Sequence, residues 1–395
     1  MKHSLILLIF ITAPFAVPCL FGADAKITID SPQELKVFQR RHEREECEVK
    51  VHGTVQGDCL AVQIRMSGKS IAGELEGKWQ TVVFDWGSKE FTAYVMLPPG
   101  GWYRLEVQAS NKKIETGRAE IEHFGVGEVF VIAGQSNSTN YGAEKQKPAS
   151  GMVSTFDGKT WRIADDPQPG VQDGSNGGSF IPAFGDALYE KYKVPIGVAC
   201  TGAGATSVRQ WLPKGEKVEP LPTLTGHVKI TGPNVGESTG ELYDGLVRRM
   251  AALGMGERVA AHATGGFRAV LWHQGESDAG QARAGYPAER QITAEKYKEL
   301  LTKIITSAGG TWFVAQTTFH SPKDPSDAEF RAAQKSLWDS PGRVAKEGPD
   351  TDVLVGDLRD GVHFSAKGQQ AHGKAWAVKV GAWLDFVLKM PTHLE

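Results

Sequence analysis

The chain has 395 residues, which exceeds one typical domain and allows a substantial buried core. Hydrophobic residues make up 41% and charged residues 23%, as is usual for a globular protein. The formal net charge of -2 gives no electrostatic basis for binding nucleic acid or an anionic membrane, so we expect a small molecule or a neutral polymer as partner.

The N-terminus has the pattern of a secretory signal peptide. Lys2 and His3 precede a mostly apolar, uncharged run over residues 5–17, and small residues suited to cleavage follow at Ala23 and Ala25. We therefore predict a signal peptide over residues 1–25 and a secreted or periplasmic protein that does not contact the membrane after cleavage. No other segment approaches the ~20 apolar residues of a transmembrane helix.

The cysteines leave one question open. Cys47 and Cys59 flank the run at residues 49–55 and could pair across neighbouring strands in an oxidising compartment. Cys200 ends an apolar run, where a buried, inert thiol is the usual state. The cysteines and the 11 histidines show no zinc-like spacing, so we expect neither a metal nor another cofactor.

Residues 26–125 have an all-β pattern. Apolar residues alternate over 91–97, the sequence Pro-Pro-Gly-Gly turns the chain at 98–101, and alternation resumes over 103–107, which predicts a hairpin. Together with earlier apolar runs around 49–51 and 62–64, this pattern predicts a small β-sandwich domain.

From about residue 127, short apolar strands alternate with amphipathic helices. The predicted strands lie near 128–133, 194–200, 267–273, 311–317 and 352–357. Five such strands predict an α/β domain over residues 126–395, with a parallel sheet covered on both faces and a site at the carboxyl ends of its strands. Two Gly/Pro-rich stretches, 143–179 and 213–237, are long for connectors and are expected to line that site.

A first candidate for chemistry is Ser136, in the sequence Gly-Gln-Ser-Asn after the buried-looking run at 129–133. A serine that leaves a strand through a glycine and enters a helix-permissive segment lies at a helix N-terminus. There its N–H and the helix dipole can stabilise a developing negative charge, which suits a nucleophile. The alternative is an ordinary helix N-cap.

Asp360 and His363 form a second candidate pair. They lie on a short loop after the apolar run at 353–358 and before a helix that is expected to begin near Ser365. Such a histidine can turn one ring nitrogen to the carboxylate and offer the other to a hydroxyl. With Ser136 they would form a Ser-His-Asp set.

Two more blocks follow predicted strands. Gln274, after the run at 267–271, can aim its side-chain N–H at an oxyanion. The glycine-rich turn at 202–206 allows a backbone N–H, such as that of Gly204, to approach a ligand closely.

A competing motif surrounds Ser238, where Gly-Glu-Ser-Thr-Gly matches the nucleophile elbow of α/β-hydrolases. That elbow requires a buried strand immediately before it, and residues 229–235 are loop-like. Ser238 and Glu241 instead match a capping box in front of an amphipathic helix. We therefore expect Ser238 to be a helix cap.

Taken in order, four motifs resemble those of the SGNH/GDSL hydrolase superfamily, and most closely its sialate O-acetylesterase-type and plant-type acetyl xylan esterase group. They are G-Q-S-N at 134–137, the glycine-rich turn at 202–206 with Trp211 after it, Q-G-E-S-D at 274–278 and D-G-V-H at 360–363. The resemblance covers residues 126–390 and implies a flavodoxin-like, doubly wound, five-stranded parallel sheet.

The resemblance makes Ser136 the nucleophile, His363 the base and Asp360 its orienter. It makes the N–H groups of Ser136 and Gly204 and the side chain of Gln274 the oxyanion donors. The chain departs from the family pattern at Ala205, where glycine is common, which leaves open which N–H points into the site.

The resemblance also implies contacts with an acetylated carbohydrate. Trp211 could stack on a sugar ring or pack in the core. Arg209, where the family often has an acid, could pair with a substrate carboxylate or have no such role. Asn137 and Glu276 are also expected to bind substrate. His273 and Glu276 could act as acids or bases, or they could support the site.

The sequence thus predicts a secreted serine esterase that removes O-acetyl groups from a polysaccharide or a sialic acid through an acyl-enzyme. A general short-acyl or lipid esterase is the alternative among enzymes. A non-catalytic carbohydrate-binding protein is the alternative among binding proteins.

Overall fold

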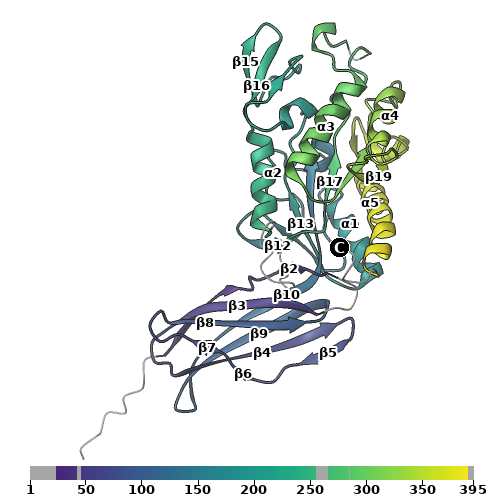
Figure 1. Ribbon diagram of the computed structural model, residues 1–395. Helices are drawn as coiled ribbons and strands as arrows, with labels where there is room; N and C mark the ends of the chain where they lie inside the picture. The colour runs from purple at the N-terminus through teal and green to yellow at the C-terminus, as the bar shows by residue number, and fades with distance from the viewer. Residues whose placement is uncertain (1–23, 42–45, 255–265, 284, 390–395) are drawn as a thin grey trace, which may run out of the picture.

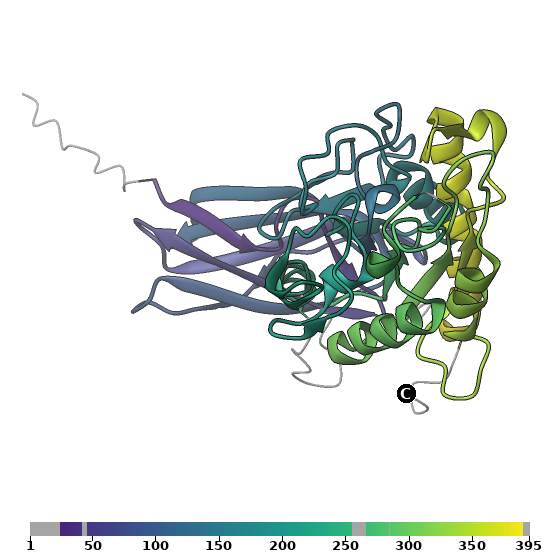
Figure 2. The ribbon, with the colours of Figure 1, turned by 90° about the horizontal axis from the view of Figure 1, so that it is seen from above.

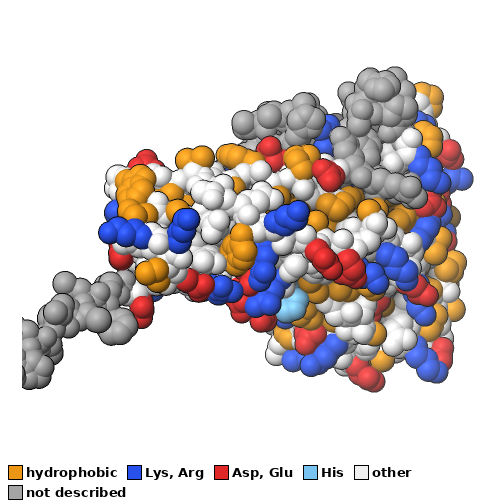
Figure 3. All heavy atoms as spheres, turned by 90° about the horizontal axis from the view of Figure 1, so that it is seen from below, with side chains coloured by type: hydrophobic (Ala, Val, Ile, Leu, Met, Phe, Trp, Pro, Cys, Tyr) orange, Lys and Arg blue, Asp and Glu red, His pale blue; other side chains and the backbone are white. Residues whose placement is uncertain are grey.

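In the computed structural model, a β-domain precedes an α/β domain (Figure 1). The structure describes residues 24–41, 46–254, 266–283 and 285–389, so nearly all of the predicted signal peptide lies outside the described residues. None of the helices in these ranges combines the length and apolar character needed to cross a bilayer. On the face in Figure 3, cationic and anionic side chains are interspersed.

The β-domain is a sandwich of two sheets. One sheet has the order β1 (Lys26–Ser31), β3 (Cys47–Gln56), β8 (Glu90–Leu97), β7 (Val83–Phe84). The other contains β2 (Lys36–Gln39), β4 (Ala61–Ser70), β5 (Gly73–Glu76), β6 (Gln80–Thr81), β9 (Gly100–Asn111) and the first part of β10 (Ile114–Gly134). Their inward-facing apolar residues form one core, to which Val49, Val51, Phe91, Val62, Leu105 and Val107 contribute.

The predicted hairpin over 91–107 is wrong. Strand β8 pairs with β3 and β7, whereas β9 pairs with β4 and β10 in the opposite sheet, so the turn at 98–101 crosses from one sheet to the other. Two strands that face each other across a core alternate in the same way as two paired strands, so the pattern could not separate the cases. Cys59 is a free thiol, so the possible disulfide between Cys47 and Cys59 is not formed.

The α/β domain is built on a mainly parallel sheet. Its order is β12 (Trp161–Ile163), β11 (Val153–Phe156), β13 (Ile196–Cys200), β10, β17 (Ala269–His273), β18 (Trp312–Gln316), β19 (Lys346–Asp350). Only β12 is antiparallel to its neighbour. The parallel α/β sheet after an all-β region is confirmed, but β11 adds a sixth parallel strand inside the stretch that was expected to be loop.

The last strand also differs from expectation. It is β19, and the run at 352–357 forms a loop that ends in the 3-10 turn η4 (Gly356–Leu358). The valines that suggested a strand are exposed, Val353 by 65% and Val355 by 47%. Strand β19 reads Lys-Glu-Gly-Pro-Asp at the edge of the sheet, where apolar alternation is not required.

Helices cover both faces of the sheet, as predicted. Helices α1 (Ile181–Tyr192) and α5 (Ala366–Val387) pack on one face, and α2 (Glu241–Ala252), α3 (Ala294–Ala308) and α4 (Ala328–Ser336) on the other (Figures 1 and 2). Strand β10 divides its side chains accordingly: Val129 and Val131 belong to the α2–α4 core, whereas Phe130 and Ile132 belong to the α1–α5 core.

Strand β10 belongs to both domains. It pairs with β9 and β2 up to residues 126–127, and with β13 and β17 from residue 128 onward. The predicted boundary at 125/126 therefore falls inside one continuous strand, and no linker separates the sandwich from the nucleophile segment.

A buried ion cluster lies where the domains meet. Glu128, fully buried, accepts hydrogen bonds from Arg40 Nε at 2.7 Å and Arg268 Nε at 2.8 Å. Gln39 Nε2 donates to the same carboxylate at 2.9 Å, and Gln39 Oε1 accepts from the N–H of Val129. Burial opposes ionisation of Glu128, but the two guanidinium groups outweigh it and lower its pKa.

Glu128→Ala should lower the free energy of unfolding by about 3–5 kcal/mol, because it leaves two guanidinium groups buried without their carboxylate. Urea denaturation followed by tryptophan fluorescence measures this. Glu299→Ala, which removes an exposed ion pair with Lys296, is the control and should cost less than ~1 kcal/mol.

The contribution of Glu128 also depends on pH. Since its folded pKa lies below the usual 4.5, the stabilisation is present above pH 4.5 and is lost as the pH falls toward the folded pKa. The stability difference between wild type and variant should therefore shrink on acidification. Equal losses in the two glutamate variants would contradict the role of the cluster.

Candidate active site

The candidate nucleophile follows directly on the end of β10. At Gly134, with φ +125°, a Cβ would lie 2.1 Å from the carbonyl oxygen of His273, so only glycine allows the ends of β10 and β17 to approach this closely. Ser136 is buried and begins the 3-10 turn η1 (Ser136–Ser138), with Gln135 at the cap position. The expected α-helix after Ser136 is therefore only a three-residue turn, and a helix dipole contributes little there.

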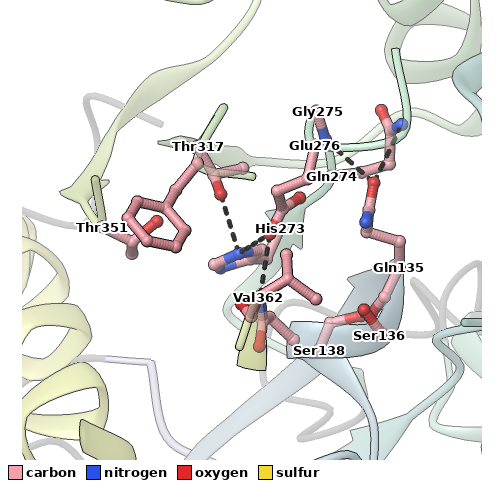
Figure 4. Close-up of polar contacts among 12 residues, drawn as sticks. Gln135, Ser136, Ser138, His273, Gln274, Gly275, Glu276, Thr317, Thr351 and Val362 are labelled. Carbon is pink, nitrogen blue, oxygen red and sulfur yellow. Dashed lines mark hydrogen bonds and ion pairs between the residues drawn. The ribbon is translucent and has the colours of Figure 1, made fainter. Parts of the chain in front are cut away.

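Gln135 attaches this turn to the loop after β17. Its Oε1 accepts hydrogen bonds from the N–H groups of Ser277 at 3.0 Å and Gly275 at 3.3 Å, and its own N–H donates to His273 O at 2.8 Å. Figure 4 shows the Gln135 amide directed at this loop. The sequence analysis missed this role, although glutamine directly before the serine of a strand-end motif was a visible signal.

Asp360 and His363 face each other across a two-residue hairpin. They are the paired residues of β20 (Arg359–Asp360) and β21 (His363–Phe364). Asn137 Nδ2 donates to the carbonyl oxygen of Val362 at 3.2 Å and to Glu276 Oε1 at 2.9 Å. The structure therefore brings the serine turn, the histidine hairpin and the Q-G-E-S-D loop to one edge of the sheet.

The described contacts include no hydrogen bond between Ser136 and His363, nor between His363 and Asp360. Asp360 is exposed and His363 half-buried. Hydrogen bonds of catalytic groups are often long without substrate and tighten in the complex. The pairing of Asp360 with His363 places both side chains on one face of the hairpin, which is compatible with such tightening.

Arg359 holds this hairpin in place. Its guanidinium donates to the carbonyl oxygens of Leu354 at 2.7 Å, Thr351 at 2.6 Å and Val362 at 2.8 Å, and it lies over the rings of Phe319 and Phe364. Burial lowers the pKa of Arg359 to about 10, so the group remains charged at neutral pH. The contacts of Arg359 thus support the hairpin in place of the strand that was expected immediately before it.

The electrostatic setting of His363 favours its neutral form. Burial lowers the pKa of His363 below 6.5, against the carboxylates of Glu276 and Asp360, which raise it. A neutral imidazole at neutral pH can accept a proton from a serine hydroxyl.

Glu276 and His273 form a buried pair beneath the site. His273 Nε2 lies 3.0 Å from Glu276 Oε1, and His273 Nδ1 lies 3.1 Å from His372 Nε2, which also accepts from the indole N–H of Trp376 at 3.0 Å. Because an indole only donates, His372 Nε2 is an acceptor and His273 Nδ1 must donate to it.

Glu276 Oε1 also accepts from Asn137 Nδ2 at 2.9 Å. Burial raises the pKa of Glu276, but the neighbouring His273 and the hydrogen bond from Asn137 outweigh it and lower this pKa to about 2. Thr317 Oγ1 completes the surroundings of His273 at 3.1 Å (Figure 4). The network gives Glu276 and His273 a supporting position.

Gln274 joins two loops through its amide. Its Nε2 donates to Asp278 Oδ2 at 2.7 Å and to the carbonyl oxygen of Thr206 at 3.1 Å. Asp278 also accepts from Ser207 Oγ at 2.6 Å and the N–H of Val208 at 2.7 Å. The expected role of Gln274 as an oxyanion donor remains a prediction, and it requires the amide to turn away from these partners.

The N–H of Gly204 is likewise engaged. It donates to Asp173 Oδ2 at 2.5 Å. The turn that carries it is held beside the nucleophile, because the N–H of Ala203 donates to Gly134 O at 2.9 Å. Ala205 adopts a left-handed conformation with φ +56°. Asp173, from the 143–179 stretch, was not identified from the sequence.

Arg209 and Trp211 lie inside the protein, with no exposed side-chain surface. Arg209 donates to Ser207 Oγ and to the carbonyl oxygens of Pro220 and Arg290, and its guanidinium pairs with Asp278 at 3.4 Å. Trp211 packs edge-on against Trp272, with ring centroids 5.2 Å apart. A sugar would reach either residue only if this core opened.

Ser238 is not a helix cap, contrary to expectation. It ends strand β16 (Val235–Ser238), which with β14 (Lys217–Val218) and β15 (Val228–Gly232) forms a small sheet in the 213–237 stretch, and Gly240 caps α2. Its Oγ donates to Leu212 O at 2.7 Å and accepts from the N–H of Gly240 at 3.1 Å. Ser365 does cap α5, as predicted, by accepting from the N–H of Gly368.

Over the ranges that the structure describes, no group of three or more histidine, cysteine or acidic side chains is placed to hold a metal ion. The polar side chains at this edge of the sheet include those of Ser136, Glu276, Asp360 and His363. Serine, histidine and carboxylates at the carboxyl ends of parallel strands define the class of an α/β hydrolytic enzyme.

A family model described as "Carbohydrate esterase, sialic acid-specific acetylesterase" matches residues 126–381. The chain belongs to this family, which confirms the resemblance inferred from the four motifs. No curated relative matches the chain.

Solved structures give only distant likenesses. A carbohydrate acetylesterase from Xanthomonas citri is 18% identical with a TM-score of 0.49, and the match covers 90% of this chain and 74% of the other. A protein from Arabidopsis thaliana is 17% identical with a TM-score of 0.43, covering 66% and 98%. A GDSL-like lipase from Parabacteroides merdae is 14% identical with a TM-score of 0.38, covering 64% and 95%. These likenesses carry no argument about function.

Gln274→Ala should reduce both stability and rate. Loss of the amide leaves Asp278 short of a buried donor, which costs about 1–3 kcal/mol in the free energy of unfolding. If the amide also serves the oxyanion, kcat should fall about 100- to 1,000-fold with KM little changed. Denaturation and steady-state hydrolysis of an acetyl ester measure the two effects.

Gln281→Ala is the matched control. This buried glutamine of the same loop bonds only backbone groups, those of Ser277 and Ile292. It should lose stability while kcat falls far less. Full activity of Gln274→Ala would exclude the oxyanion role.

Proposed function

We propose that this protein is a secreted serine esterase that removes O-acetyl groups from a carbohydrate. The observation that carries the proposal is the single edge of the sheet at which Ser136 and the Asp360–His363 hairpin meet, joined by the amide of Asn137. Membership of a carbohydrate esterase family supports an acetylated sugar as substrate. The signal-like sequence at residues 1–25 supports secretion.

In the proposed mechanism, His363 takes the proton of Ser136 as Oγ attacks the acetyl carbonyl carbon. The tetrahedral intermediate collapses when the sugar oxygen leaves with the proton from His363, and an acetyl-enzyme remains. Water then attacks the acetyl group with His363 again as base, and acetate is released. Asp360 orients the imidazole and stabilises its charged form.

The negative oxygen of the intermediate needs N–H donors. The N–H of Ser136 is one, and those of Gly204 and Gln274 become available when substrate displaces Asp173 and Asp278 from them. Preorganised donors of this kind contribute a large share of the rate in acyl transfer.

A short-acyl or lipid esterase is the first rival. A cavity of about 790 Å³ lies between the sandwich and the α/β domain, but its lining residues, among them Phe38, Tyr94 and Trp161, include none of the site residues. It is therefore no acyl-chain pocket for Ser136. A non-catalytic sugar-binding protein is the second rival, and the complete Ser136, His363 and Asp360 set argues against it.

Ser136→Ala should cut kcat by on the order of a million-fold, because it removes the nucleophile. His363→Ala should resemble it, and the double variant should be scarcely worse, since the two residues act as a unit. Release of acetate from an acetylated sugar measures the rates.

Ser238→Ala is the matched serine control. It should keep near-wild-type kcat and lose about 1–2 kcal/mol of stability, because Ser238 only bonds backbone groups. An inactive Ser238→Ala beside an active Ser136→Ala would reverse the assignment.

The pH profile of kcat/KM should show an acid limb centred below pH 6.5, because His363 must be neutral and its pKa is lowered. Asp360→Asn removes a charge that raises this pKa, so the limb should move to still lower pH. If Asp360 orients the imidazole, kcat should also fall by up to about 10⁴-fold.

Glu276→Gln tests the other carboxylate. It should likewise lower the midpoint of the acid limb, and it should destabilise the protein because His273 loses its buried partner. Abolition of activity in Glu276→Gln, with little change in Asp360→Asn, would transfer the orienting role to Glu276.

A further inference from the structure

The ring of Tyr141 lies over the candidate active site. It stacks on His363, with ring centroids 5.0 Å apart and planes inclined by 26°. Its phenol end packs against Gly204, where an added Cβ would lie 2.6 Å from Tyr141 Cε2. Tyr141 nevertheless remains 40% exposed. An exposed aromatic surface beside the general base is well suited to the C–H face of a sugar.

Asp173 lies next to this ring. Its carboxylate accepts from the N–H groups of Gly204 at 2.5 Å and Ser175 at 2.9 Å. Gly204 connects the two groups, because it packs against the Tyr141 ring and its N–H donates to Asp173. Burial raises the pKa of Tyr141, and the negative charge of Asp173 raises it further. Asp173 is half-buried, and the ion pairs of the described residues include none to it. A carboxylate of this kind is a strong acceptor for sugar hydroxyl groups.

The arginine side chains near the site make hydrogen bonds within the protein. Arg209 is fully buried in its own network, and Arg359 donates to three backbone carbonyls. Lys145 is exposed and its Nζ contacts Asn176 Oδ1 at 3.5 Å, one residue beyond Ser175. The charged groups that act on His363 are the carboxylates of Glu276 and Asp360 and the guanidinium of Arg359, so carboxylates outnumber cations there.

We propose that Tyr141 and Asp173 form the sugar-binding wall of the site and select O-acetylated sugars without a carboxylate over acetylated sialic and uronic acids. Tyr141 packs on the ring of the sugar, and Asp173 accepts its hydroxyl groups and repels a carboxylate. The selection differs from the sialic acid specificity in the description of the family. It rests on the proposed function, in which Ser136 attacks the acetyl group.

The test compares kcat/KM for acetylated methyl glucoside and acetylated methyl glucuronide, which differ only at C6. The wild-type enzyme should prefer the neutral sugar by about tenfold or more, since like charges in a partly buried site repel strongly. The preference should shrink as salt is raised, because the repulsion is screened. Asp173→Asn should bring the ratio close to one. The readout is a ratio within each variant, so a change in overall rate cancels.

Two variants separate the sources of selectivity. Asp385→Asn makes the same change in net charge far from the site, on α5, and should keep the wild-type ratio. Lys145→Ala should not favour the neutral sugar further. A wild-type preference for the glucuronide that Lys145→Ala abolishes would overturn the proposal, as would an unchanged ratio in Asp173→Asn.

Measurements of sugar binding test the roles of Tyr141 and Asp173 independently of catalysis. In the Ser136→Ala background, calorimetry should find weaker binding of the acetylated glucuronide than of the glucoside, and Tyr141→Ala should weaken both while Tyr141→Phe retains them. Equal affinities would overturn the inference. Failure of the wild type to hydrolyse 4-nitrophenyl acetate, an ester without a sugar, would instead contradict the proposed function.

Discussion

The structure depends on the main-chain hydrogen bonds of β10, which is 21 residues long and is shared by both domains. One half of the strand is held by β9 and β2, and the other half by β13 and β17. The path of β10 out of the sandwich therefore determines the position of Gly134, the last residue of the strand. The turn that carries Ser136 begins at that point, so its position follows from strand pairing that starts some 20 residues earlier.

Buried carboxylates hold the loops that surround this turn. Glu128 joins the two domains, Glu276 ties the serine turn to the β17 loop, and Asp278 connects that loop to the glycine-rich turn. Each accepts at least one hydrogen bond from a segment that is distant in sequence. Because breaking such a buried pair is costly, the loops are held with little freedom although few regular elements connect them.

The sequence predicted those features that local pattern determines. Alternation in apolar strands and the 3.6-residue period of the helices located the α/β sheet and its covering layers. The motifs indicated Ser136, Asp360 and His363, whose segments lie at one edge of the sheet. The prediction from sequence was wrong where one pattern fits two arrangements, as for β8 and β9. It was also wrong where an edge strand has no apolar pattern, as for β19.

The side-chain partners could not be predicted for a different reason. Whether Gln274 faces a substrate or Thr206, and whether Arg209 is exposed or enclosed, depends on contacts between residues about 70 positions apart. Local sequence carries no information about such contacts. Asp173 lay in a segment without any motif, so only its distance from Gly204 identified it.

The continuity of β10 has a consequence for how this protein can be divided. The family match begins at residue 126, which is inside the strand and two residues before Glu128. A fragment cut there would lose Arg40, Gln39 and the pairing with β9, and would leave the Glu128 carboxylate with Arg268 alone among its cationic partners. Replacing the sandwich would therefore require a substitute that restores both the pairing along β10 and the partners of Glu128.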